Sequence, residues 1–181
     1  MSMHQILADV AAAIAGVLER ELPKVGKDWW QSCVVDRLSI QQQRLVSDRR
    51  VDSLAGLDLA GLLRVFDQNW NPLGYQLNLD QQTRNWLKEA QGIRNRWAHL
   101  PPGGLRSEDA YRDVDTLYRL LGVLGADQAT LDRAQAERGR VLGELAPRPK
   151  IDDVAAPVAQ VRGGISKGTV VRLKARPDIT G

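Results

Sequence analysis

Three polar residues with complementary chemistry lie together in the segment 94–99. Arg94 and Asn95 are followed by His99, and the only other histidine of the chain is His4. A guanidinium is permanently charged, whereas an imidazole titrates near neutral pH, so the pair can stabilise a phosphate and move a proton without a metal ion. The spacing therefore predicts cleavage of a phosphodiester bond, with Arg94, Asn95 and His99 as the candidate catalytic residues.

The element that must position these residues is an amphipathic helix over 80–99, which the run of prolines and glycines at 101–104 ends. At 100° per residue, its apolar stripe consists of Trp86, Ala90, Ile93 and Trp97. The opposite stripe is about 20 Å long and consists of Arg84, Lys88, Gln91, Asn95 and His99, with Arg94 on the flank. Because a line of cations and amides suits a phosphate backbone, the candidate RNA-binding residues are Arg84, Lys88 and Gln91 of this stripe, together with Arg96.

The same residues also have an interpretation without function. The polar side of an amphipathic helix is usually its solvated face. The helix dipole favours His99 at a C-terminus, and Arg94 is equally explained as the partner of a structural carboxylate. In this alternative the chain is a structural bundle whose acids, such as Glu89, Glu108 and Asp109, neutralise the polar face.

The rest of residues 1–145 is predicted to be helical as well, because apolar residues recur at helical spacing. The expected helices run from residue 3 to the stop at Pro23, then over 28–45, 58–70, 80–99, 107–124 and, most weakly, 127–145. Asp28 and Ser107 are the expected N-caps of the second and fifth helices. Residues 48–56 are expected to be a loop and residues 71–74 a turn. With no alternating strand pattern before residue 146, the fold class is all-α, an antiparallel bundle of five to six helices.

The C-terminal region has a different composition. Residues 146–164 are rich in proline, alanine and glycine and are predicted to be a linker. Residues 165–181 contain one strand-like run, 168–174. A single strand does not fold alone, so this segment is interpreted as the start of a further, incomplete β-domain of a longer protein. The predicted domains are thus 1–145, 146–164 and 165–181.

Charge and composition exclude several classes of protein. Residues 146–181 carry seven Lys and Arg against three Asp, whereas residues 1–145 carry 18 basic and 19 acidic residues, so the helical part is not a uniformly basic surface. Cys33 is the only cysteine, which excludes an intrachain disulfide and a cysteine-based zinc site. No membrane span, signal peptide, phosphate-binding Walker loop or metal-ligand motif is recognised. We therefore expect a cytoplasmic chain with no metal, no cofactor and no membrane partner.

The motif Arg94-Asn95-x3-His99 resembles the R-φ-x3-H motif of the HEPN superfamily, in which φ is usually Asn, Asp or His. The surrounding segments 67–70, 85–89 and 93–99 resemble the HEPN branch found at the N-termini of large bacterial ATPases and helicases of defence loci. The resemblance covers about residues 1–125. One position departs from a toxin branch of the family, which carries a modifiable tyrosine two residues after the histidine, where this chain has Pro101.

The resemblance implies a metal-independent endoribonuclease that acts as a homodimer on RNA. The ribose 2′-OH attacks the neighbouring phosphorus and leaves a 2′,3′-cyclic phosphate. Carried over to this sequence, His99 handles a proton, Arg94 stabilises the charge on phosphorus and Asn95 orients the imidazole or a phosphate oxygen. The second copy of the chain supplies the second imidazole. The resemblance further implies a fused or associated ATPase or helicase and a role in phage defence or stress response.

A competing interpretation of the same resemblance is a catalytically inactive module that mediates dimerisation or binds nucleic acid for a helicase or ATPase. In that case the chemistry belongs to a motor domain outside this chain. Incubation of the purified chain with RNA in EDTA separates the two, because only the enzyme yields cyclic-phosphate products that Arg94→Ala abolishes.

Overall fold

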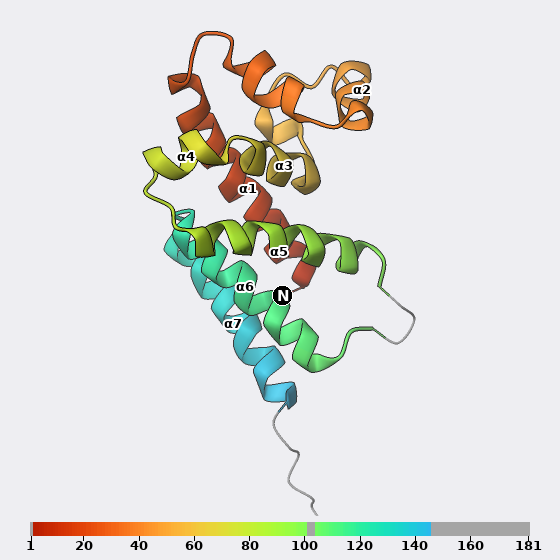
Figure 1. Cartoon of the computed structure of the whole chain (residues 1–181). Helices are drawn as coiled ribbons and strands as arrows, with labels where there is room; N and C mark the ends of the chain where they lie inside the picture. Colours follow the sequence, from red (N-terminus) through yellow and green to blue (C-terminus); the bar gives the residue numbers. More distant parts are fainter. Residues whose placement is uncertain (1, 101–103, 146–181) are drawn as a thin grey trace, which may run out of the picture. The chain divides into compact units, whose positions relative to one another are not determined.

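The computed structural model describes residues 2–100 and 104–145, and the regular elements of these residues are all helices (Figure 1). The all-α prediction is confirmed. The proposed linker 146–164 and the strand-like segment in 165–181 lie outside the described residues. None of the described helices is both long and apolar enough to span a lipid bilayer.

Seven α-helices and four shorter helical turns make up the described part of the chain. The α-helices are α1 (Met3–Glu21), α2 (Ile40–Asp48), α3 (Leu59–Gln68), α4 (Trp70–Gln76), α5 (Gln81–Ala98), α6 (Ser107–Val123) and α7 (Gln128–Leu145). The turns are η1 (Leu22–Lys24), η2 (Trp30–Val34), η3 (Val35–Arg37) and η4 (Leu54–Gly56).

The core forms where α1 meets the later helices. Helix α1 contacts α3, α5 and α6, while α6 packs along both α5 and α7 (Figure 1). The apolar residues that recur at helical spacing along α1 are buried: Ile6, Val10, Ile14 and Val17. Phe66 of α3 is the largest of the fully buried side chains. Since full burial of such a side chain contributes about 1.5–3 kcal/mol, this shared core is what holds α5 in place.

The predicted second helix, 28–45, is wrong as a continuous element. The chain forms a wide turn at η2 and a tight turn at η3, and Leu38 is extended with ψ 157°. Two tertiary bonds accompany this break: Asn69 Nδ2 donates to the carbonyl of Cys33 at 2.7 Å, and Arg64 Nε donates to that of Arg37 at 2.8 Å. These carbonyls accept hydrogen bonds from side chains in the middle and at the end of α3. Because the donors are distant in sequence, local periodicity does not reveal the break.

Helix α2 begins instead at a capping box. Ser39 Oγ accepts from the backbone N–H of Gln42 at 3.3 Å, and Gln42 Oε1 accepts from the N–H of Ser39 at 3.0 Å. This Ser-x-x-Gln signal is present in the sequence, within the range assigned to the longer helix. Asp28 is not the N-cap that the sequence suggested.

The predicted turn at 71–74 is also wrong, because these residues lie inside α4. Pro72 occupies the first turn of that helix, where a backbone N–H has no intrahelical partner and proline is tolerated. The change of direction comes after α4, where Asn78 adopts φ 52°.

Three helix starts fall where acidic residues predict them. The side chains of Asp58, Asp80 and Asp127 accept from the backbone N–H groups of Gly61, Thr83 and Thr130, each at 2.8 Å. The expected N-cap of α6 is wrong by one residue. Arg106 is its N-cap and Ser107 its first helical residue, with no side-chain cap bond.

Candidate functional site

The candidate catalytic residues lie at the C-terminal end of α5. This helix ends at Ala98, and His99 is its C-cap, with φ −130° and ψ 47°. The His99 N–H donates to the carbonyl of Arg96 at 3.2 Å, and the residue is exposed. The predicted helix over 80–99 is therefore confirmed to within one residue. Because His99 leaves the helical path, the 100° periodicity no longer fixes where its imidazole lies.

Arg94 is held by two side chains. Its Nη2 donates to Oδ2 of Asp58 at 3.0 Å, and its Nη1 donates to Oδ1 of Asn95 at 3.3 Å. The other oxygen of Asp58 caps α3 through Gly61. The Arg94 side chain is 34% exposed and that of Asp58 59% exposed, so the ion pair adds only about 0–1 kcal/mol to stability. Its effect is to fix the guanidinium while leaving other N–H groups for a phosphate.

The predicted polar stripe of α5 divides into bound and free side chains. Arg84 Nε donates to Asp67 Oδ1 at 3.0 Å, and its guanidinium lies 5.6 Å from the ring centroid of Trp70. This residue therefore ties α5 to α3 and α4. Lys88 and Gln91 remain exposed.

Arg96 lies on the side of α5 that contacts α6. It forms an ion pair with Asp113 of α6, whose side chain is 2% exposed. The second carboxylate oxygen accepts from Trp97 Nε1 at 2.9 Å. A buried carboxylate with two donors fixes the end of α5 against α6. Of the four proposed RNA-binding residues, Arg84 and Arg96 thus hold the fold, and Lys88 and Gln91 face solvent.

The core-facing side of α5 differs from the predicted stripe. Its buried residues are Thr83, Leu87, Ala90 and Ile93, whereas Trp86 and Trp97 are half-buried. The shift arises because α5 lies between α3 and α6 and is covered on two sides (Figure 1).

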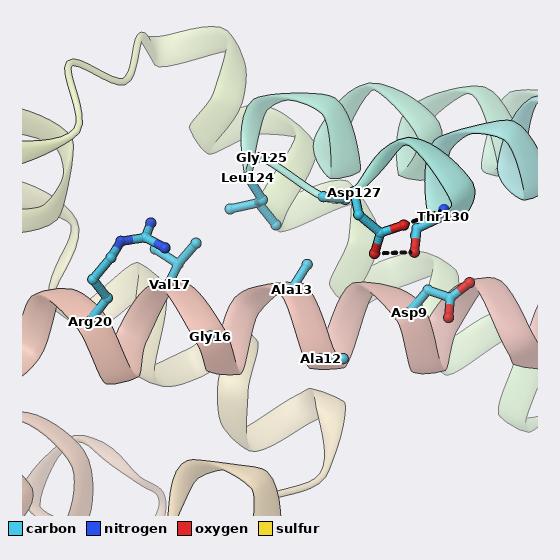
Figure 2. A pocket seen from close by; sticks show the side chains of 11 residues that line it. Asp9, Ala12, Ala13, Gly16, Val17, Arg20, Leu124, Gly125, Asp127 and Thr130 are labelled. Carbon is cyan, nitrogen blue, oxygen red and sulfur yellow. Dashed lines mark hydrogen bonds between the residues drawn. The ribbon is translucent and has the colours of Figure 1, made fainter.

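Two of the cavities near the core have polar groups that already bond with one another. A cavity of about 390 Å³ lies between α1 and the turn that joins α6 to α7 (Figure 2). There Asp127 binds Thr130, and Asp9 forms an ion pair with Arg133. A second cavity, of about 340 Å³, lies between α5 and α6, and its Glu89 accepts from Thr116 at 2.9 Å. These bonds explain the polar groups without a ligand.

A third cavity lies beside Arg94. It has a volume of about 240 Å³ and is formed by α2, the turn η4 and the start of α3. Asp58, the partner of Arg94, lines it. Among residues 2–100 and 104–145, no group of three or more His, Cys, Asp or Glu side chains is placed to hold a metal ion.

Comparison with known families identifies the fold. The profile of the Swt1-like HEPN family matches residues 5–125. The chain belongs to this HEPN family. The match begins within α1, extends through α6 and contains the whole motif from Arg94 to His99. The comparisons with curated proteins and with solved structures gave no significant match. The resemblance of the sequence to the HEPN superfamily is confirmed, and membership supports a nuclease or another nucleic-acid-related module.

Two residues of the site region were not found from the sequence. Asp58 was recognised only as the start of a helix, and nothing local shows that its second oxygen binds Arg94, 36 residues away. Asp113 did carry a signal, since it lies three residues after Ala110 and four before Leu117, on the apolar side of its helix. A carboxylate at such a position must find a partner, which here is the pair Arg96 and Trp97.

Proposed function

We propose that this chain is a metal-independent endoribonuclease domain. The observation that carries the proposal is the end of α5 in a HEPN protein, where an exposed His99 follows a half-exposed Arg94 in the R-φ-x3-H arrangement. This arrangement offers one group that moves protons and one that stays charged, next to solvent and therefore open to a large substrate.

In the proposed reaction the ribose 2′-oxygen attacks the adjacent phosphorus, and the bond from phosphorus to the 5′-oxygen breaks. One imidazole accepts the proton of the 2′-OH, and a second donates a proton to the leaving 5′-oxygen. Arg94 offsets the charge that develops on the phosphorane oxygens. Asn95, bonded to Arg94, orients the guanidinium or a phosphate oxygen. The products are a 2′,3′-cyclic phosphate and a 5′-hydroxyl.

The reaction needs two proton-handling groups, and His99 is the single histidine near Arg94 in the sequence. We therefore propose a homodimer whose composite site contains His99 and Arg94 from both copies. Two-fold symmetry places identical residues opposite one another, which suits this requirement. HEPN domains commonly dimerise and act on RNA.

The biological setting is also a proposal. A cytoplasmic protein with a fused or associated ATPase or helicase, acting in phage defence or stress response, follows from the likeness of segments 67–70, 85–89 and 93–99 to that HEPN branch. In such a protein the second component would control access to the HEPN dimer.

The alternative function is an inactive HEPN module for dimerisation or nucleic-acid binding. One observation favours it: Arg94 already has a carboxylate partner, Asp58, and Arg84 and Arg96 are tied to Asp67 and Asp113. A phosphate must compete with Asp58 for the guanidinium before catalysis.

The test is cleavage of end-labelled RNA by the purified chain in EDTA, with His99→Ala and its matched control His4→Ala. His4 is the other histidine and is also exposed. We expect cyclic-phosphate products from the parent and from His4→Ala, and none from His99→Ala. RNA binding without cleavage by the parent supports the inactive module. Cleavage by His99→Ala at the parental rate refutes the catalytic proposal.

A further inference from the structure

The cations around α2 differ from those of α5. Arg44, Arg49 and Arg50 are exposed, and in the part of the chain that the structure describes none of them has a carboxylate partner. Asp48 and Asp52 stand in the same segment, yet no ion pair joins them to these arginines. We call Arg44, Arg49 and Arg50 the α2 arginines. Their donors are available to an anion that is not part of the described chain.

One of the α2 arginines occupies a backbone position that disfavours it. Arg50 has φ 51°, and the bonds Arg50 N–H to Ser47 O at 3.2 Å and Val51 N–H to Val46 O at 2.9 Å close α2 in a Schellman motif. A left-handed conformation strains a side chain with a Cβ, and glycine avoids that strain.

Helices α4 and α6 end in the same Schellman motif, but their residues of positive φ are asparagine and glycine, which tolerate that conformation. Asn78 follows α4 with φ 52°, and Gly125 follows α6 with φ 73°. The bonds Leu79 N–H to Gly74 O and Ala126 N–H to Leu121 O complete these motifs. An arginine in place of Asn or Gly is therefore not explained by the turn itself, and a strained residue of this kind points to a use for its side chain.

The cavity beside α2 has the character of a pocket for one planar ring. Its apolar wall consists of Leu38, Leu45, Val46, Val51 and Leu57, and its polar groups include those of Gln42 and Arg49. The volume of about 240 Å³ lies below the ~300–1,000 Å³ of pockets for drug-sized ligands. The aliphatic wall can contact the face of an unpaired base, and the amide of Gln42 and the guanidinium of Arg49 can bond its edge.

The pocket and the proposed catalytic residue Arg94 are connected through Asp58. Asp58 lines the pocket and bonds Arg94 at 3.0 Å. Arg49 also lines the pocket, so a strand with a base in it passes both Arg49 and the ion pair of Asp58 with Arg94.

We propose that the surface formed by Arg49, Arg50 and this pocket binds single-stranded RNA next to the scissile phosphate. One unpaired base enters the pocket, and flanking phosphates contact Arg49, which lines the pocket, and Arg50, which follows it. Arg44 lies on the opposite face of α2 and is not part of this contact. A base inside a duplex cannot enter, so the substrate is single-stranded at this point. The inference rests on the proposed function for the identity of the ligand, and it assigns the substrate contact to α2 instead of the polar face of α5.

The experiment measures binding by anisotropy of labelled single-stranded RNA, in the His99→Ala background so that the RNA stays intact. Arg50→Gly is the sharpest variant, because it removes the guanidinium and relieves the backbone. We expect Arg50→Gly alone to unfold at a higher temperature than its parent. Combined with Arg49→Ala, it should bind RNA about tenfold more weakly than the parent. The slope of log K against log salt should become shallower by about 0.7 for each phosphate that no longer meets a guanidinium. Lys27→Ala, which removes an exposed cation outside this surface, is the control and should bind like the parent.

A second arm tests the pocket with oligonucleotides that contain a single abasic position. One position near the cleavage site should lower affinity about tenfold, because the missing base no longer fills the apolar pocket. Equal affinity at every position refutes the pocket, and parental binding by Arg49→Ala with Arg50→Gly refutes the surface. If those variants bind and cleave like the parent while His99→Ala does not cleave, the nuclease proposal stands and this inference fails. If the parent does not cleave but the variants bind RNA more weakly, the nuclease proposal fails and the RNA-binding surface stands.

Discussion

Charged side chains form ion pairs at the interface between α5 and α6, whereas the arginines around α2 form none among the described residues. At the interface, cations meet carboxylates across the contact: Arg96 of α5 meets the buried Asp113 of α6, and Arg112 of α6 lies 3.4 Å from Glu89 of α5. Around α2, exposed arginines stand without such partners among the described residues, and α2 itself has no buried residue. Figure 1 shows α2 apart from α6 and α7. The first region therefore uses charge to hold helices together, whereas the arginines of the second are unpaired among the described residues and include those of the surface proposed to bind RNA.

Arg94 lies between the two regions, and its substitution gives the largest contrast. We expect Arg94→Ala to lower the rate of RNA cleavage by about 100-fold or more, because the charge on phosphorus then lacks its stabilising group. Arg112→Ala removes a cation that belongs to the α5–α6 interface and should leave the rate within about twofold, as surface ion pairs contribute little. Single-turnover cleavage with saturating protein measures both. Equal reductions for the two variants contradict the division of roles.

The next effect concerns stability. Asp113→Ala removes the acceptor of Arg96 and Trp97 and leaves a buried gap, so we expect a decrease of about 2–3 kcal/mol in the free energy of unfolding. Asp48→Ala, at the exposed end of α2, should change it by less than about 0.5 kcal/mol. Urea denaturation followed by circular dichroism gives both values. Comparable decreases at the two aspartates would show that the two regions do not differ in how they use charge.

A smaller effect is expected where the two regions meet. Asp58→Asn keeps an oxygen for the N–H of Gly61 but removes the negative charge opposite Arg94. Affinity for single-stranded RNA should rise about fivefold, because a phosphate no longer competes with a carboxylate, while stability falls by about 1 kcal/mol at most. Binding and thermal unfolding of the same samples test this. Unchanged or weaker binding shows that Asp58 does not restrain Arg94.

The smallest effect is a response to acid at the caps of two helices, α5 and α7. Hydrogen bonds from the backbone N–H and hydroxyl of Thr83 lower the pKa of Asp80, and those of Thr130 likewise lower the pKa of Asp127. The unfolded chain therefore binds these protons more tightly. Stability from both caps is complete above the ordinary carboxyl pKa of about 4 and is lost as pH falls through the lowered values.

Helix α2 starts at Ser39 and Gln42, which do not titrate, so its cap is insensitive to this change. Melting temperatures between pH 6 and pH 3 should fall less for Asp80→Asn than for the parent, since an amide keeps the cap without a titrating proton. An identical fall in both proteins would show that Asp80 does not contribute to acid sensitivity.

The helical class, the positions of most helices and the motif at 94–99 could all be predicted from the amino-acid sequence. These features depend on neighbours within one or two helical turns: apolar spacing, acidic N-caps such as Asp58 and Asp80, and the residues that end a helix. The start of α2 at Ser39 also has a local signal, although it was hidden inside a longer apolar pattern.

Which polar groups are already bound depends on how the helices pack. The break before α2 accompanies a bond from Asn69 to the carbonyl of Cys33, 36 residues away. Arg94 and Arg96 look alike in the sequence, yet one meets the exposed Asp58 and the other the buried Asp113. A helical wheel gives the direction of a side chain but not what lies there, because the partner belongs to another helix. The availability of a cation for RNA is therefore a property of helix packing, and the periodicity of α5 could not supply it.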